Sequence, residues 1–189
     1  FSGLDASVAG EIEGAFAEAG HIVVSNARNY RMMADVPLIV PEVNAEHLKL
    51  LEAQAGGRKW RGRIVTNPNC STVVLATALA PLRQFGLTTT MITTLQAISG
   101  AGYPGVPSWD ILGNVIPYIG DEEPKIEAEI PKFLGKAVGD AVQSAPFPVS
   151  AHANRVPVEH GHTVCVSVEL DKKGSASDVE AAMDAWTGA

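Results

Sequence analysis

The segment Thr66-Asn67-Pro68-Asn69-Cys70-Ser71-Thr72 decides the fold of this chain. The β-branched residues 63–66 predict a buried strand, which ends at Pro68 because proline has no N–H for a strand ladder. Residues 71–85 carry apolar side chains in helical register and predict a helix. Cys70 therefore lies at a strand-to-helix turn, where unpaired backbone N–H groups and the helix dipole favour a thiolate. This position suits a nucleophile, and a buried cysteine that only packs is the alternative.

The residues before this segment alternate between strand and helix patterns. Residues 1–4 are typical of a strand end, residues 5–19 predict a helix, and residues 21–25 predict a short strand. Four apolar side chains share one face of that helix, namely Val8, Ile12, Phe16 and Ala19. Strand, helix and strand joined by tight turns predict a parallel sheet. Residues 25–31 follow the carboxyl end of the second strand, where open α/β sheets bind ligands.

The sequence after residue 86 predicts a different sheet. Residues 87–99 form a long β-branched run, with the polar Gln96 near the end of one face. Residues 150–158 and 162–170 predict two further strands in a hairpin-like connection. His162 begins the apolar face of the last strand, where burial could bring its pKa near neutrality. A hydrogen-bonded core histidine is the alternative interpretation.

Other local signals predict helices and a loop. Asn44 is a favourable N-cap for a helix that ends near residue 55. Residues 121–125 open another helix, which Pro131 is expected to kink or split. Residues 135–147 predict a loop rich in glycine, alanine and proline, and residues 177–180 predict a capping box.

The composition indicates a protein with a substantial core and argues against nucleic acid and membrane as partners. The chain has 189 residues, 46% of them hydrophobic, so it can bury a substantial core. The net charge is −7, and the largest basic cluster is residues 58–63, which argues against nucleic acid as the main partner. No apolar run approaches the roughly 18 residues that a membrane-spanning helix needs, so no membrane partner is expected.

Cysteines and histidines point to a reduced protein without a metal. Cys70 and Cys165 could form one disulfide, but nothing else indicates secretion, so a cytoplasmic location is the simpler interpretation. His152, His160 and His162 could form a metal cluster, yet no Cys-x-x-Cys or His-Glu-x-x-His spacing supports a zinc site.

Several motifs occur in order over nearly the whole chain. They are residues 25–31 (Ser-Asn-Ala-Arg-Asn-Tyr-Arg), 67–72 (Asn-Pro-Asn-Cys-Ser-Thr), 95–102 (Leu-Gln-Ala-Ile-Ser-Gly-Ala-Gly), 122–125 (Glu-Glu-Pro-Lys), 154–158 (Asn-Arg-Val-Pro-Val) and 161–163 (Gly-His-Thr). In this combination the chain closely resembles the aspartate-β-semialdehyde dehydrogenases, especially their archaeal and fungal branch.

The resemblance implies an α/β fold with a partial Rossmann-type parallel sheet. Residues 1–69 would be the C-terminal part of a NADP-binding Rossmann domain. Residues 70–189 would be a catalytic and dimerisation domain with a mixed sheet flanked by helices. The implied reaction is NADPH-dependent reduction of L-aspartyl-4-phosphate to aspartate semialdehyde, on the path to lysine, methionine and threonine. The implied partners are this small-molecule substrate, phosphate and a second copy in a homodimer or homotetramer.

The resemblance also implies a role for each site residue. Cys70 would form a thioester, His162 would act as general acid and base, and Gln96 would orient the acyl group. The substrate-binding residues would be Arg155 for the α-carboxylate, Glu122 for the α-amino group, Lys125 and Arg31 for the phosphate, and Asn69 for the developing negative charge. The residues near the nicotinamide would be Ser2, Gly3, Ser25, Asn26, Ser71 and Thr72.

The family's opening segment, which carries a glycine-rich nucleotide loop, has no counterpart in these residues, and neither does its C-terminal end. The chain begins with Phe1 in a strand-like segment, so it is expected to be part of a longer protein. Alone it is expected to bind NADPH weakly and to turn over little or no substrate.

Three rival functions remain open on the sequence. Malonyl-CoA reductase shares the scaffold and the thioester chemistry, although Arg155 and Glu122 favour an amino-acid substrate. A cysteine hydrolase could use Cys70 and His162 without any nucleotide. A non-catalytic dimerisation module could use the long strand of residues 87–99 as its contact surface.

Overall fold

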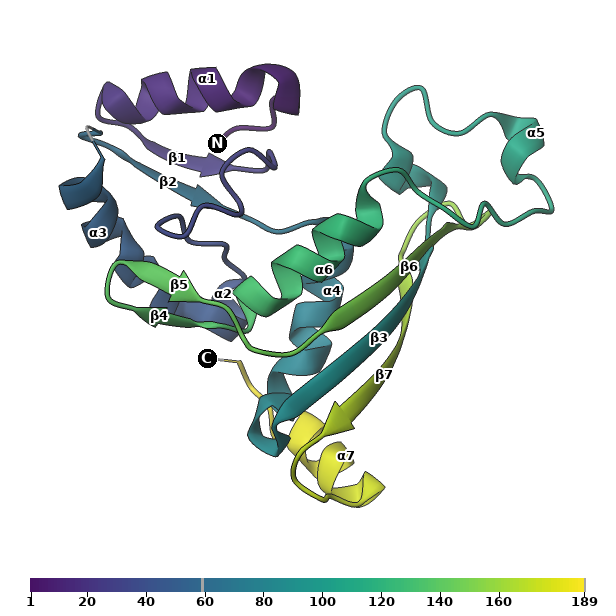
Figure 1. Ribbon diagram of the computed structural model, residues 1–189. Coiled ribbons are helices and arrows are strands. Elements are labelled where there is room, and N and C mark those ends of the chain that lie inside the picture. Colours follow the sequence, from purple (N-terminus) through teal and green to yellow (C-terminus); the bar gives the residue numbers. More distant parts are fainter. Residues whose placement is uncertain (59, 189) are drawn as a thin grey trace. The chain divides into compact units, whose positions relative to one another are not determined.

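The computed structural model describes residues 1–58 and 60–188, so Lys59 of the basic cluster lies outside the described residues. They form two compact units. The first unit contains residues 1–69, 131–145 and 186–188, and the second contains residues 70–130 and 146–185. The predicted fold class is confirmed, because the described strands form one parallel sheet, one mixed sheet and one short antiparallel pair, accompanied by helices (Figure 1).

The helices and strands follow one another in the order shown in Figure 1, where 3-10 helices carry the letter η in the text. They are α1 (Ala6–Glu18), β1 (Ile22–Ser25), α2 (Pro41–Asn44), η1 (Ala45–Lys49), α3 (Leu50–Gly57), β2 (Arg63–Thr66), α4 (Cys70–Leu79), η2 (Ala80–Phe85), β3 (Leu87–Gln96), η3 (Ile98–Ala101), α5 (Ser108–Ile111), α6 (Glu122–Phe133), β4 (Lys136–Val138), β5 (Ala141–Gln143), β6 (Val149–Arg155), β7 (Thr163–Leu170) and α7 (Ala176–Asp184). Within the described residues, no helix is long and apolar enough to cross a bilayer.

The first unit is built on the predicted parallel sheet. Strands β1 and β2 pair in parallel, from Ile22 opposite Arg63 to Ser25 opposite Thr66. Single parallel bridges extend the sheet on both sides, from Ser2 to Ser25 and from Leu38 to Thr66. The carboxyl ends of β1 and β2 therefore lie together at one edge of this sheet.

Helix α1 packs on this sheet through a different face from the predicted one. The large side chains of the predicted face are exposed, with Val8 46%, Ile12 39% and Phe16 53% accessible. Ala9, Glu13 and Ala17 are buried instead, at positions four residues apart. Two of these three side chains are methyl groups, which let the helix approach the strands closely.

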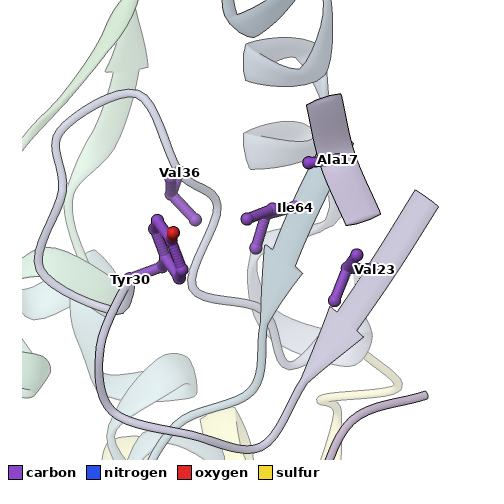
Figure 2. Close-up of a cluster of buried hydrophobic side chains, with 5 residues drawn as sticks. All are labelled: Ala17, Val23, Tyr30, Val36 and Ile64. Atoms are coloured by element: carbon purple, nitrogen blue, oxygen red, sulfur yellow. The ribbon is translucent and has the colours of Figure 1, made fainter. Parts of the chain in front are cut away.

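A small apolar cluster fills the space between α1 and the strands. Figure 2 shows Ala17, Val23, Tyr30, Val36 and Ile64 pointing toward one another, and all five are buried. The Tyr30 hydroxyl also donates a hydrogen bond of 2.6 Å to the Gly10 carbonyl of α1. The cluster thus fixes the segment after β1, which carries several predicted ligand-binding residues.

Two predicted helix starts differ in the structure. Asn44 occupies the N-cap position of η1, as predicted, but its side chain makes no capping bond there and its amide instead donates to the Leu38 carbonyl at 2.8 Å. The predicted single helix is divided into η1 and α3. The last helix begins two residues earlier than predicted, with Ser175 as N-cap and Asp178 completing the capping box. Local side-chain bonds of this kind determine helix ends more strongly than apolar periodicity does.

The loop predicted at residues 135–147 contains the β4–β5 hairpin, and α6 continues through Pro131 to Phe133 without a break. The hairpin is held in the first unit by a backbone bond of 3.0 Å from the Val142 N–H to the Ala34 carbonyl. A short antiparallel pair therefore takes the place of part of the predicted loop.

The second unit contains a three-stranded mixed sheet in the order β6-β3-β7 (Figure 1). Strand β3 pairs in parallel with β6 and antiparallel with β7. The predicted hairpin between the last two strands is wrong, because β3 lies between them. The predicted alternation along β3 is confirmed, with Thr90, Ile92, Thr94 and Gln96 buried. Gln96 lies opposite Arg155, at the carboxyl ends of β3 and β6.

Candidate active site

The second unit brings a thiol and an imidazole together. Cys70 is the first residue of α4 and is exposed. His162 immediately precedes β7, and its Nε2 atom lies 3.3 Å from the Cys70 Sγ atom. The Ala97 backbone N–H, which follows β3, donates to His162 Nδ1 at 3.1 Å. Three elements that are distant in the sequence therefore fix this pair.

The bond from Ala97 assigns the proton of the imidazole. A neutral ring has one donor and one acceptor nitrogen, so a ring that accepts at Nδ1 carries its hydrogen on Nε2. That hydrogen is directed at the Cys70 sulfur. Partial burial lowers the pKa of His162 and the Arg155 charge lowers it further, against a smaller upward effect of Glu122. His162 is therefore a neutral donor at pH 7.

A carboxylate and an amide form the inner side of the site. Gln96 is 1% exposed and donates from Nε2 to Glu122 Oε2 at 3.2 Å. Lys125 donates from Nζ to the other carboxylate oxygen, Oε1, at 3.1 Å. Glu122, the first residue of α6, is thus held from both sides and is 7% exposed.

Arg155 ends strand β6 and is 5% exposed. Its Nη1 donates to the Ala97 carbonyl at 2.7 Å, so Ala97 binds Arg155 through its oxygen and His162 through its nitrogen. Burial lowers the pKa of Arg155, while the negative charge of Glu122, and that of Cys70 once it is ionised, raise it. A guanidinium remains charged at neutral pH in this setting.

Gly100 lies where the backbone approaches two of these groups. A Cβ atom at this position would lie 2.8 Å from His162 Cε1 and 3.0 Å from Arg155 Nη1. The glycine loop after β3 is therefore part of the wall of the site, and any larger residue would displace the imidazole or the guanidinium.

The expected lowering of the Cys70 pKa is wrong in direction. Partial desolvation raises the pKa of the thiol, and the negative charge of Glu122 raises it further. Hydrogen bonds from Ser71 and from the Cys70 backbone, at the start of α4, act in the predicted downward direction but are weaker. The free protein at pH 7 is therefore expected to hold a thiol next to a neutral imidazole.

This electrostatic arrangement predicts the pH dependence of alkylation at Cys70. The rate with iodoacetamide should follow a single ionisation with a midpoint above the usual thiol value of about 8.5. Glu122→Gln should move the midpoint to lower pH, because it removes a negative charge that disfavours the thiolate. Cys165→Ser serves as the background throughout, so that only one thiol reacts. A rate plateau between pH 5 and 8, typical of a thiolate–imidazolium pair, would contradict the assignment.

The predicted residues near the nicotinamide are divided between the two units. In the first unit, the Ser2 and Ser25 hydroxyls donate to Glu13 Oε1 at 2.6 and 2.7 Å. Asn26 is exposed, and its Oδ1 accepts from Asn67 Nδ2 at 2.7 Å. Gly3 is exposed beside Ser2. In the second unit, Ser71 and Thr72 on α4 are fully buried, and no hydrogen-bond partner of the Thr72 hydroxyl is found in the described part of the chain.

Arg31 and Asn69, the remaining predicted substrate ligands, belong to the first unit. Arg31 is 7% exposed and donates from Nη2 to the Asn26 carbonyl at 2.7 Å. Lys132 donates to the Met33 carbonyl at 2.7 Å, which fixes the same loop. Asn69 is also buried.

Sequence reasoning missed Glu13 as well as the contribution of the Ala97 backbone. A glutamate between two alanines on one face of α1 was a usable signal for Glu13, because a buried carboxylate requires hydrogen-bond donors. The histidines considered as metal ligands do not form a site, since no group of three His, Cys, Asp or Glu side chains in residues 1–58 and 60–188 could hold a metal.

The chain belongs to the semialdehyde dehydrogenase family. The model of the family's dimerisation domain matches residues 79–189, and the model of its NAD binding domain matches residues 1–51. The predicted resemblance to aspartate-semialdehyde dehydrogenases is also confirmed. The enzyme of that name from Archaeoglobus fulgidus is 53% identical over 184 residues, which cover 97% of this chain and 54% of that protein.

Solved structures of aspartate-semialdehyde dehydrogenases also resemble this chain. The aspartate-semialdehyde dehydrogenase of Candida albicans with NADP superposes with a TM-score of 0.85 at 46% identity, over 96% of this chain and 54% of that one. The Vibrio cholerae aspartate-semialdehyde dehydrogenase II complexed with ASA superposes with a TM-score of 0.80 at 28% identity, over 97% and 59% of the two chains. The chain thus spans little more than half the length of these relatives.

Proposed function

We propose that this chain carries the catalytic site of a NADP-dependent aspartate-semialdehyde dehydrogenase. It would catalyse the reversible conversion of L-aspartyl-4-phosphate to L-aspartate 4-semialdehyde, with release of phosphate, in lysine, methionine and threonine synthesis. The observation that carries the proposal is the 3.3 Å contact between Cys70 Sγ and His162 Nε2, with the imidazole oriented by Ala97. Relatives of that name at about half identity support it. The two free cysteines favour a reducing, cytoplasmic setting.

Cys70 would form the covalent intermediate. Its thiolate attacks the acyl carbon of the aspartyl phosphate, the carbon–oxygen bond to phosphate breaks, and phosphate leaves with the electron pair. The product of this step is a thioester on Cys70. Because the resting thiol has a raised pKa, its proton must pass to solvent water before attack. The Cys70 anion raises the pKa of Arg155, and this attraction between the two charges in turn favours the thiolate.

His162 would stabilise negative charge in the reductive step. Its Nε2–H lies beside the sulfur, so it would donate a hydrogen bond to the acyl oxygen as that oxygen becomes negative, without releasing the proton. Expulsion of the Cys70 thiolate then gives the aldehyde. The hydrogen bond from Ala97 opposes a role for neutral His162 as base toward the thiol, because Nδ1 is already an acceptor.

The charged ends of the substrate have matching partners in the same unit. Arg155 offers a buried guanidinium for the α-carboxylate, and Glu122 offers a carboxylate for the α-amino group. Gln96 would orient the acyl group between them. Lys125, and Arg31 and Asn69 from the first unit, would bind phosphate and the developing negative charge.

NADP(H), which supplies the hydride when bound, fits the residues at the carboxyl edge of the first unit's sheet. There the Ser2 and Ser25 hydroxyls are oriented by a buried carboxylate, and Gly3 and Asn26 are exposed beside them. Ser71 and the buried Thr72 hydroxyl would supply further hydrogen-bonding groups from α4.

A substrate comparison in the full-length protein tests the proposal. Phosphate- and NADP-dependent oxidation of aspartate semialdehyde should exceed NADPH oxidation with malonyl-CoA by at least about 100-fold in kcat/KM, because only the amino acid pairs with both Glu122 and Arg155. A preference for malonyl-CoA, or ester hydrolysis without nucleotide, would refute it.

We also propose a homodimer or homotetramer formed through the segment that matches the dimerisation domain. Strand β3 presents Met91, which is 61% exposed, on its outer face. A second copy could cover this face. Light scattering of the full-length protein should give at least a dimer mass, and a strict monomer would contradict this assignment.

A further inference from the structure

Strand β6 lies at an edge of the mixed sheet, yet three successive outward N–H groups near its carboxyl end have partners. The Ala151 N–H donates to Glu127 Oε1 at 3.0 Å, and the Ala153 N–H donates to Glu123 Oε1 at 3.0 Å. The next outward N–H, that of Arg155, donates to the Ile116 carbonyl at 2.8 Å. Two carboxylates of α6 thus take the place of a neighbouring strand.

The spacing of these bonds matches the repeats of the two elements. Four residues of an α-helix rise about 6 Å, and two residues of a strand rise about 6.6 Å. Glutamates four residues apart on α6 can therefore reach alternate N–H groups of β6. We refer to Glu123 and Glu127 with the amides of Ala153 and Ala151 as the carboxylate ladder.

Each side of the carboxylate ladder carries groups of the candidate site. Helix α6 begins with Glu122, the neighbour of Glu123, and includes Lys125 one turn later. Strand β6 ends with Arg155, two residues beyond Ala153. The catalytic steps proposed above assign no function to Glu123 or Glu127, and therefore none to the carboxylate ladder.

We propose that Glu123 and Glu127 are positioning residues that fix the register of α6 against β6 and thereby set the separation between the Glu122 carboxylate and the Arg155 guanidinium. The inference rests on the proposed function, in which these two groups bind the α-amino and α-carboxylate groups of one amino acid. Ala153 is fully buried and Ala151 is 3% exposed, so a lost acceptor leaves a buried N–H unpaired and favours movement of the helix.

The test compares Glu123→Leu with Glu123→Gln in the full-length protein with NADP and phosphate. Leucine removes the acceptor, whereas glutamine keeps an acceptor oxygen and loses only the charge. Glu123→Leu should raise KM for aspartate semialdehyde about tenfold, with kcat and KM for NADP within threefold of the parent. Glu123→Gln should restore KM to within threefold. Glu180→Leu, at an exposed position of α7, is the matched control and should change nothing.

The outcomes separate the inference from the proposed function. A parent enzyme that turns over aspartate semialdehyde, with the same KM in Glu123→Leu, overturns the inference alone. An equal rise of KM in the leucine and glutamine variants also overturns it, because charge rather than the acceptor would then matter. A full-length parent without this activity overturns the proposed function and the inference together.

If Glu123→Leu does not fold, Glu123→Asp provides a second test, because it shortens the side chain by one methylene and keeps the carboxylate. Glu123→Asp should raise KM for aspartate semialdehyde at least threefold, and an unchanged KM overturns the inference.

Discussion

In the full-length protein, replacing Cys70 with serine is expected to lower kcat for the proposed oxidation of aspartate semialdehyde by about 10⁴-fold or more. A hydroxyl ionises far less readily than a thiol, and the environment of residue 70 already disfavours the anion through partial desolvation and the charge of Glu122. Serine therefore keeps the geometry at the start of α4 but provides almost no nucleophile. Initial rates with saturating NADP and phosphate measure the loss.

Cys165→Ser is the matched control for this substitution. Cys165 is the other free cysteine, is exposed, and lies on β7 opposite Thr93 of β3. Its replacement should leave kcat within twofold. If Cys70→Ser kept a tenth of the activity, the thioester route would be refuted.

The second large effect is expected at His162. His162→Gln should lower kcat by about 10²- to 10³-fold, because the flexible amide lacks the ring that the Ala97 N–H holds in place and no longer directs a fixed donor at the developing oxyanion. KM for aspartate semialdehyde should change less than threefold, since Arg155 and Glu122 remain in place. Steady-state kinetics from pH 6 to 9 provides both values.

The variant also tests the assigned donor role of the imidazole. Alkylation of Cys70 in His162→Gln should keep a midpoint within half a pH unit of the parent, because the hydrogen bond to sulfur is retained. His162→Ala loses that donor and should raise the midpoint further. A midpoint that falls in either variant would show that the imidazole does not stabilise the thiolate.

Local patterns in the sequence predicted much of the candidate site. The strand-to-helix turn placed Cys70 at the start of α4, and period-two alternation placed Gln96 on the buried face of β3. Both features depend on residues close together in the chain. The motif resemblance then grouped His162 and Arg155 with them, and the second unit contains all four residues.

The features that sequence reasoning missed depend on distant residues. Strand β3 separates β6 from β7, and no local pattern specifies which of three apolar strands takes the middle. The pKa of Cys70 rises partly through Glu122, which begins a helix far along the chain. The face of α1 was misjudged because large apolar side chains suggested burial, whereas Ala9 and Ala17 permit the closest approach to the sheet.

The central place of β3 has a consequence for how the protein forms during synthesis. Strand β3 leaves the ribosome with both edges open, and its two neighbours, at residues 149–155 and 163–170, are made much later. Such long-range pairing slows folding and leaves a β-branched strand exposed to other nascent chains. Yield in a cellular expression host should therefore depend on chaperone capacity and on translation speed between β3 and β7.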